Sequence, residues 1–334
     1  MLKAIALGVV FAAAQGLIQP VAGPPAWQYG SMAGADLGAG ASLNGAVPFP
    51  ANNPWNTDIS GADVDPNSAD LIASIPMSGG LHPDFGKGTY EGAILGIPYV
   101  VVGAGQPRVK VKFTLYPEQS DRGRYPVPPN APIEGFKPGG GGFQGDRHVL
   151  VVDRDANRLY ELYRAFPQTD GSWKAGSGAV FHLDSNNVRP TAEPGWTSAD
   201  AAGLPIFPGL VRYDEASTGF IGHALRFTVP NSRRAYVPPA THWASDSTNP
   251  DLPPMGMRVR LKASYVIPAG FSRETKAILR ALKTYGMFVA DNGSGWFLSG
   301  APDPRWNNDR LHSELGQVAR SNFEVVKMEG LVTP

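Results

Sequence analysis

Cysteine is absent from the 334-residue sequence, which excludes several kinds of chemistry. Thiol catalysis, disulfide exchange and cysteine-ligated zinc or iron–sulfur sites all need that side chain. Charge is also scarce, because only 17% of the residues are charged and the 29 basic ones balance the 29 acidic ones. A protein with a formal net charge of zero lacks the excess of basic residues that is typical of nucleic-acid-binding proteins. We therefore expect no nucleic-acid partner.

Glycine and proline are abundant, with 40 and 32 residues that together make up more than a fifth of the chain. They show no collagen-like period, and so many helix-breaking residues argue against a helical bundle or a coiled coil. The hydrophobic fraction of 42% is still large enough for a sizeable core. The composition thus predicts a folded protein rather than a disordered chain.

The N-terminal part has the pattern of an export signal. Lys3 precedes an apolar run over 4–14, which is shorter than the ~20 residues that a membrane-spanning helix needs. We expect residues 1–23 to be a secretory signal peptide, so the mature protein is predicted to be secreted or periplasmic with no membrane as partner. Residues 24–47, nearly free of charge, are predicted to form a flexible leader, and residues 48–334 a single β-rich domain.

Most of the remaining pattern is typical of β-strands. Turn residues bound seven segments that are rich in β-branched and aromatic side chains, at 97–102, 109–115, 147–152, 158–166, 180–183, 223–229 and 257–265. A further hairpin is predicted from 287–290 and 296–299, which flank a Gly-rich turn. Many short strands joined by long loops indicate a mainly β fold, either a β-sandwich or a jelly roll.

One helix is predicted, at about 272–286. Ser272 is a suitable N-cap, apolar residues then recur with helical spacing, and Gly286 is a suitable stop. Strict alternation of strands and helices is absent, so a Rossmann or TIM-barrel architecture is not expected.

A hairpin over 147–164 contains the most informative cluster of polar residues. Its turn predicts a register in which Leu150 lies opposite Glu161 and His148 opposite Tyr163. Glu161 and His148 then share an otherwise apolar sheet face with Tyr163, where partial burial shifts pKa values. Two interpretations stay open: a proton-transfer site, or a buried hydrogen-bonded trio that only holds the strands together.

A second cluster lies in the loop 194–205. Trp196 is a candidate for stacking on a sugar ring, and Asp200 is a candidate acid, base or nucleophile. The alternative is that Asp200 caps a short turn and Trp196 packs in the core. Glu215, at an ordinary helix start, is a reserve catalytic acid.

The histidines do not form a metal motif, since none occurs in an HxH, HxxxH or HExxH pattern. We expect no metal site and no cofactor, although the carboxylates could hold a structural Ca²⁺ ion.

Polar turns provide four further candidate substrate-binding residues, which are His82, Asp84, His242 and Trp243. GxSxG and P-loop motifs are absent as well, so serine-esterase and nucleotide-dependent functions have no support.

Four segments, at 53–59, 81–86, 145–153 and 195–203, resemble segments of a group of secreted bacterial β-rich proteins. The similarity runs from about Phe49 onward and so covers nearly all of the predicted mature chain. The resemblance implies one exported β-rich domain. No characterised activity is attached to this group, so the resemblance implies no catalytic residue.

These observations predict a secreted enzyme that acts on an extracellular polysaccharide. Glycoside hydrolysis needs two carboxyl groups, about 5 Å apart for retention or about 6.5–9.5 Å for inversion, and our candidate pair is Glu161 and Asp200. A polysaccharide lyase is an alternative, with His148 or Tyr163 as base or acid and Arg226 neutralising a uronate. A non-catalytic carbohydrate- or surface-binding protein is another, in which the aromatic side chains form a stacking platform.

Overall fold

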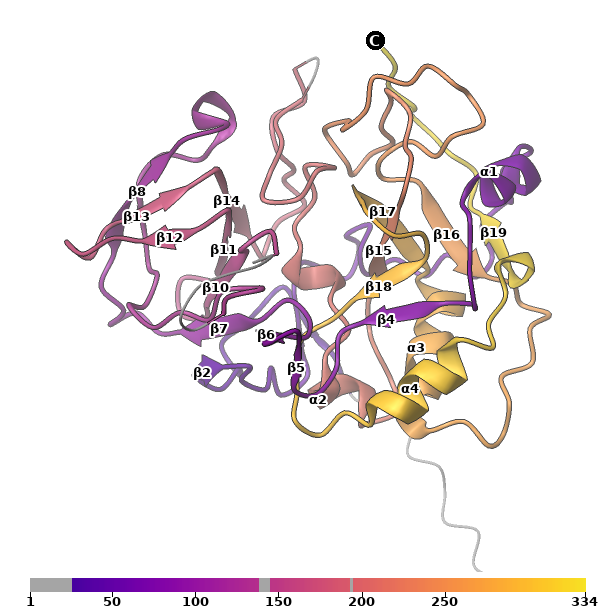
Figure 1. Cartoon of the computed structure of the whole chain (residues 1–334), viewed down its shortest axis with the longest axis horizontal. Coiled ribbons are helices and arrows are strands. Elements are labelled where there is room, and N and C mark those ends of the chain that lie inside the picture. Colours follow the sequence, from indigo (N-terminus) through magenta and orange to yellow (C-terminus); the bar gives the residue numbers. More distant parts are fainter. Residues whose placement is uncertain (1–25, 138–144, 193–194) are drawn as a thin grey trace, which may run out of the picture.

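The structure, a computed structural model, is mainly β and describes residues 26–137, 145–192 and 195–334. The prediction of a mainly β fold is therefore confirmed. The five-stranded and four-stranded sheets form one half of the molecule, and a six-stranded sheet with most of the helices forms the other (Figure 1). The predicted signal peptide, 1–23, lies outside the described residues.

The predicted hairpin is the centre of the five-stranded sheet. Leu150 lies opposite Glu161, as the turn predicted, and both strands of the hairpin have neighbours on their outer edges. Leu150 packs in the larger hydrophobic core and Val151 in the smaller one, so both faces are covered. The strand order is β14 (Ser177–His182), β11 (Arg158–Tyr163), β10 (Val149–Asp153), β7 (Tyr99–Val102) and β2 (Gly38–Ala39).

The six-stranded sheet joins distant parts of the chain. Its order is β19 (Phe323–Val325), β16 (Arg258–Leu261), β17 (Met287–Asn292), β15 (Leu225–Val229), β18 (Phe297–Ser299) and β4 (His82–Asp84). The predicted hairpin between 287–290 and 296–299 is wrong, because β15 lies between these two strands. The strand β15 is almost entirely buried and offers backbone hydrogen-bonding groups on both edges, so each segment pairs with it instead.

The four-stranded sheet consists of β12 (Phe166–Pro167), β13 (Trp173–Ala175), β8 (Val109–Phe113) and β9 (Arg124–Tyr125). Alternate side chains of β8, β9 and β13, including Trp173 and Tyr125, pack on the smaller core. Two short pairs complete the β structure: β1 (Gln28–Tyr29) with β3 (Ala46–Val47), and β5 (Thr89–Tyr90) with β6 (Ala93–Ile94).

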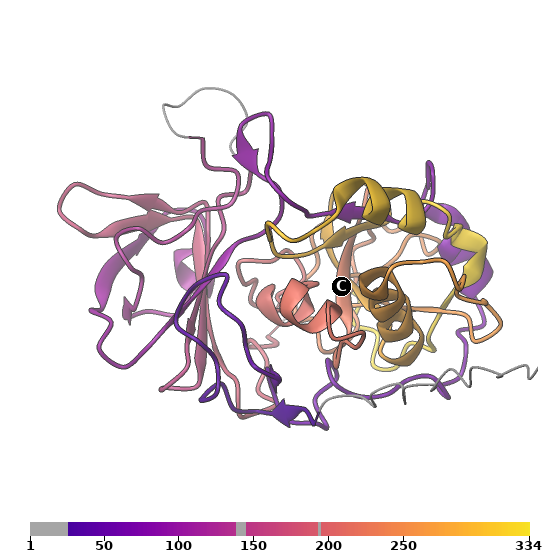
Figure 2. The same ribbon diagram turned by 90° about the horizontal axis from the view of Figure 1, so that it is seen from below.

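The helices are α1 (Ser68–Ser74), α2 (Tyr213–Ala216), α3 (Arg273–Thr284) and α4 (Asn308–Leu315). The predicted helix is confirmed as α3, where the Ser272 side chain accepts a hydrogen bond from the backbone N–H of Thr275. Gly286 follows at φ +67°, a conformation that favours glycine. Figure 2 shows α2, α3 and α4 gathered beside the six-stranded sheet, away from the four-stranded sheet. Within the described ranges, none of the helices has the length and apolarity to cross a membrane.

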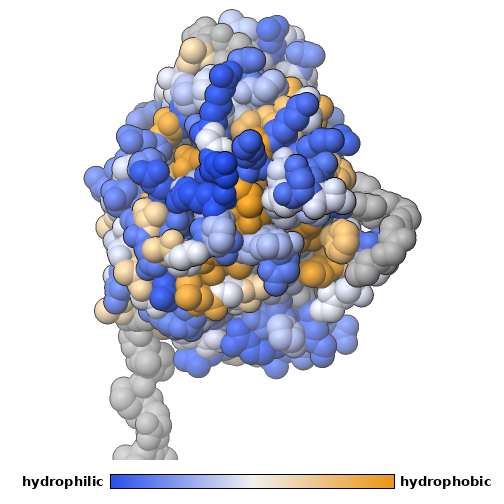
Figure 3. Space-filling view, turned by 90° about the vertical axis from the view of Figure 1, so that its left-hand side faces the viewer, coloured by the Kyte–Doolittle hydropathy of each residue, from blue (hydrophilic) through white to orange (hydrophobic). Residues whose placement is uncertain are grey.

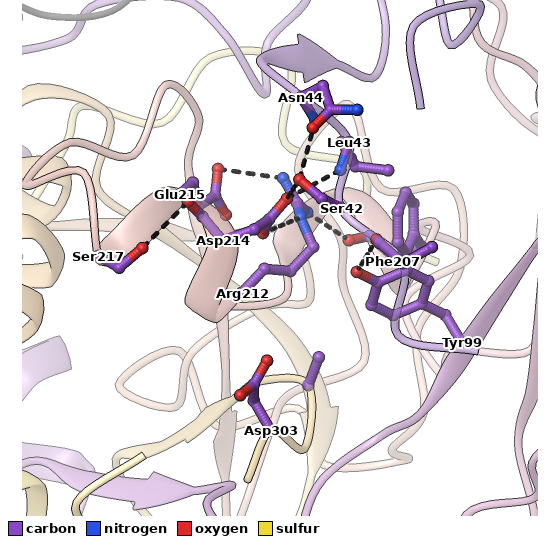
Figure 4. Close-up of polar contacts among 12 residues, drawn as sticks. Ser42, Leu43, Asn44, Tyr99, Phe207, Arg212, Asp214, Glu215, Ser217 and Asp303 are labelled. Atoms are coloured by element: carbon purple, nitrogen blue, oxygen red, sulfur yellow. Dashed lines mark hydrogen bonds and ion pairs between the residues drawn. The ribbon is translucent and has the colours of Figure 1, made fainter. Parts of the chain in front are cut away.

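The segment 26–47 packs into the fold, so the prediction of a flexible leader is wrong for this part. Met32 and Leu43 are buried in the larger core. The carboxylate of Asp214 accepts hydrogen bonds from the Ser42 hydroxyl and the Leu43 backbone N–H (Figure 4). The glycines of this segment supply turns with positive φ rather than disorder.

Candidate active site

A cleft of about 520 Å³ opens between the two halves of the molecule. The strands β11 and β14 border it on one side with Tyr163 and Ser177, and the end of β17 borders it on the other. Its lining combines four carboxyl groups with three aromatic rings: Asp146, Asp200, Asp246 and Asp291, and Tyr116, Tyr163 and Trp243. No lysine or arginine is among the described residues that line it.

The loop that carries Asp200 is fixed against β17. The backbone N–H of Ala202 donates to the carbonyl oxygen of Ala290 over 3.1 Å, and the N–H of Thr241 donates to the carbonyl oxygen of Ala202 over 3.0 Å. Nδ1 of His242 lies 2.9 Å from the carbonyl oxygen of Ala201, and burial lowers the pKa of this histidine. These contacts bring Asp200 close to the end of β17.

Asp200 forms a buried ion pair with Arg226 of β15. Arg226 Nη2 lies 2.8 Å from Asp200 Oδ2, and the backbone N–H of Ala202 donates to Oδ1 over 2.8 Å. Arg226 Nη1 donates to the Ser299 hydroxyl over 2.7 Å, which ties the pair to β18. Burial raises the pKa of Asp200 while Arg226 opposes the rise. The Asp200 side chain is fully buried, so it forms the wall behind the cleft.

Asp291 ends β17 and is partly exposed in the same cleft. The register between β15 and β17 shifts just before it, and such a bulge changes the direction of a side chain. Burial and the nearby charge of Asp200 raise the pKa of Asp291 to about 7. Among the described residues, no cation lies within ion-pair distance of its carboxyl group, whose Oδ1 accepts the N–H of Asn292 over 2.7 Å. Asp291 can therefore hold a proton near neutral pH.

His148 lies behind the loop that forms this wall. Its Nδ1 is 2.6 Å from Oε2 of Glu134, and its Nε2 is 3.0 Å from the carbonyl oxygen of Ala199. Burial alone would lower the pKa of His148, but the Glu134 carboxylate outweighs it and raises that pKa to about 9. The buried imidazolium is thus bonded on both sides and does not face the cleft.

Glu161 is fully buried and does not line the cleft. Its carboxylate accepts the backbone N–H groups of Ile206 and Phe207 over 2.9 to 3.0 Å. Burial raises its pKa to about 7 while these two donors oppose the rise. Glu161 and His148 share a sheet face, but each has other partners, which favours a structural role for both.

Glu215 and Trp196 also lie outside the cleft lining. Glu215 is buried between Arg212, at 3.1 Å, and Nε2 of His223, at 3.0 Å. Arg212 also lies 3.9 Å from Asp214, whose carboxylate holds the segment 42–43 (Figure 4). Trp196 packs beside the buried guanidinium of Arg189, whose central carbon lies 5.4 Å from the centre of the Trp196 ring.

His82 and Asp84 lie elsewhere, on the edge strand β4. The His82 ring stacks on Phe297 with 3.9 Å between ring centres. Asp84 lines a separate cavity that also contains Glu134. Of the predicted site residues, the cleft brings together Asp200, Tyr163, His242 and Trp243, with Arg226 directly behind.

The sequence analysis missed Asp146, Asp246 and Asp291, which line the cleft, and Glu134, which holds His148. Asp291 follows the apolar run 287–290, and a carboxylate at the end of a buried strand is a recognisable pattern. The hairpin prediction for 287–299 places Asp291 in the turn and so hides this pattern. Glu134 lies in a Gly/Pro-rich stretch and carried no such pattern.

Within the ranges that the structure describes, no group of three or more histidine, aspartate or glutamate side chains is placed to hold a metal ion. Comparisons of the chain with protein-family models, with curated proteins and with solved structures found no match.

Proposed function

We propose that the protein is a glycoside hydrolase that uses the carboxyl groups of this cleft on a polysaccharide. The observation that carries the proposal is Asp291: its pKa is raised to about 7, and it faces a cleft that contains a second, exposed carboxyl group, that of Asp146. Asp146 comes from the side of the five-stranded sheet and Asp291 from the six-stranded sheet. A carboxyl group on each side of the scissile bond is the arrangement that glycoside hydrolysis needs.

The two groups have different parts in the proposed reaction. Asp291, with a pKa of about 7, keeps its proton in part of the molecules at neutral pH, and in its protonated form it gives that proton to the glycosidic oxygen as the bond from that oxygen to the anomeric carbon breaks. Asp146, as carboxylate, takes a proton from the water that adds to the anomeric carbon, or attacks that carbon itself. Asp200 is a positioning residue, because its buried charge disfavours ionisation of Asp291.

The remaining lining supports binding of a sugar. Trp243, Tyr163 and Tyr116 provide aromatic faces on which sugar rings stack. We further propose that the five-stranded and four-stranded sheets, which enclose the smaller core, form the predicted sandwich. The secreted or periplasmic localisation is part of the same proposal.

Two alternatives are less well supported. A lyase would need a free cation for the uronate, but Arg226 is buried and already paired with Asp200. A purely binding protein would have no need of a carboxyl group with a raised pKa in its cleft.

The test is hydrolysis of a panel of polysaccharides, with detection of reducing ends and of unsaturated products. Asp291→Asn and Asp146→Asn should each lower the rate at least ~10²-fold without changing the melting temperature. Asp246→Asn, at an exposed carboxyl of the same cleft, is the matched control and should retain most of the activity. Unsaturated products would instead support the lyase, and binding without any product would support the binding protein.

A further inference from the structure

The outer face of the four-stranded sheet is strongly basic. Alternate residues of β8 point away from the smaller core, and the exposed ones are Lys110 and Lys112. Arg124 of β9 and Lys174 of β13 are exposed in the same way. Figure 3 looks onto this side of the molecule and shows strongly hydrophilic side chains around apolar ones across its middle.

These cations are direct neighbours across the strands. Lys110 pairs with Arg124, and Lys112 pairs with Lys174. Residues in register on adjacent strands lie about 5 Å apart, and alternate residues along one strand about 7 Å apart. Like charges in such positions repel one another and destabilise a sheet. The sequence therefore maintains a grid of positive charge that folding alone does not favour.

Few carboxylates offset this charge. The strands β8, β9, β12 and β13 contain neither aspartate nor glutamate, and among the described residues no ion pair joins the four cations to a carboxylate. At the rim, Asp170 is held by Ser172 near Lys110, and Glu118 pairs with Arg122 over 3.4 Å. The face is thus positive in a protein whose formal net charge is zero.

We propose that this face is a docking surface for an acidic polysaccharide, whose carboxylate or sulfate groups contact Lys110, Lys112, Arg124 and Lys174. A polymer with repeated negative charges matches a grid of cations along and across strands. The chain continues from β8 to Tyr116, which lines the cleft, so a glycan on the sheet would lie beside the cleft mouth. The cleft lining itself carries carboxyl groups and no lysine or arginine, so the acidic segments bind on the sheet and not in the cleft.

This surface does not depend on the proposed hydrolysis, and its test measures binding alone. The probe is a fluorescently labelled alginate oligosaccharide, which is a polyuronate, titrated with the full chain and followed by fluorescence anisotropy. Lys110→Gln/Lys112→Gln/Lys174→Gln should raise the Kd at least ~10-fold and flatten its dependence on salt between about 0.05 and 0.3 M NaCl. Unchanged melting temperatures would show that both proteins are folded.

The matched control is Lys87→Gln/Lys276→Gln/Lys327→Gln, which removes the same charge outside this sheet, at two exposed sites and, for Lys276, at a partly exposed one. It should leave the Kd for alginate within about twofold of the wild type, because distant charges are screened. The proposal is overturned if wild-type protein does not bind alginate, or if both triple variants lose affinity equally. Tighter binding of a DNA duplex or of phosphatidylserine vesicles than of alginate would also overturn it.

Discussion

Oε2 of Glu134 lies 2.6 Å from Nδ1 of His148, and Nε2 of the same ring lies 3.0 Å from the carbonyl oxygen of Ala199. A carbonyl oxygen only accepts hydrogen bonds, so Nε2 is the protonated nitrogen in this contact. Nδ1 faces the Glu134 carboxylate, which also accepts a hydrogen bond. The ring therefore makes both hydrogen bonds when both of its nitrogens carry a proton. His148 thereby joins Glu134, β10 and the loop behind the cleft.

This contact predicts that stability falls in mildly alkaline solution. The folded pKa of His148, about 9, is above its unfolded value of about 6.5. The stabilisation is therefore fully present below pH ~6.5 and is lost as the pH rises through ~9, with an upper limit of about 3 kcal/mol. Urea unfolding of the wild type and of His148→Gln over this pH range should show a steeper slope for the wild type. Equal slopes would contradict the assignment.

Asp291 predicts the pH dependence of the proposed activity. A general acid must be protonated, so kcat should fall as the pH rises above about 7. Asp200→Asn removes the negative charge that disfavours ionisation of Asp291 and leaves Arg226 nearby. The pKa of Asp291 should therefore fall, and the decrease in kcat should begin at a lower pH. A pH–rate profile of both proteins on one substrate checks this. If kcat of Asp200→Asn falls at the same pH as that of the wild type, the positioning role of Asp200 is ruled out.

The buried pair between Asp200 and Arg226 predicts strong coupling in stability. Arg226→Met leaves the Asp200 carboxylate without its cation and should cost about 3–5 kcal/mol of unfolding free energy. Arg226→Met/Asp200→Asn removes both charges and should cost less than the single Arg226 change. Chemical denaturation of the four proteins of this cycle measures the coupling. Additive losses would show that the pair does not act as a unit.

Glu161 predicts a loss of stability rather than of chemistry. Glu161→Ala leaves the N–H groups of Ile206 and Phe207 without acceptors in the core, which should cost at least about 1–3 kcal/mol. Glu161→Gln keeps one oxygen acceptor and should cost less. Melting temperatures and the rate per folded molecule separate the two effects. A Glu161→Gln protein that is stable but inactive would return Glu161 to the candidate catalytic residues.

The sequence predicted the elements that are determined by residues close together along the chain. The register of β10 and β11 follows from one tight turn and an apolar alternation, and α3 follows from its cap and its helical spacing. The insertion of β15 between β17 and β18 depends on pairing between residues more than 50 positions apart, for which no local pattern exists. The error over 26–47 has another cause, since a Gly-rich composition is shared by flexible leaders and by tightly turned, packed segments.

For the site, residue types in loops were informative but their partners were not. Asp200, His242 and Trp243 were found because loops between strands tend to carry functional side chains. The sequence analysis predicts Glu161 and Asp200 as one catalytic pair, but Glu161 lies outside the cleft. Its carboxylate is buried in the core, where it accepts hydrogen bonds from two backbone N–H groups. Sequence does not show which buried acid has such donors.

The edges of the six-stranded sheet, β4 at residues 82–84 and β19 at residues 323–325, come from opposite ends of the chain. This sheet is complete only when nearly the whole polypeptide is available. The strand β4 pairs with β18, His82 with Phe297, and contacts between residues so far apart in the sequence slow folding, because a long loop must be ordered before the pairing stabilises it. A chain that stops before residue 323 would leave an edge of β16 unpaired, and an unpaired strand edge favours aggregation.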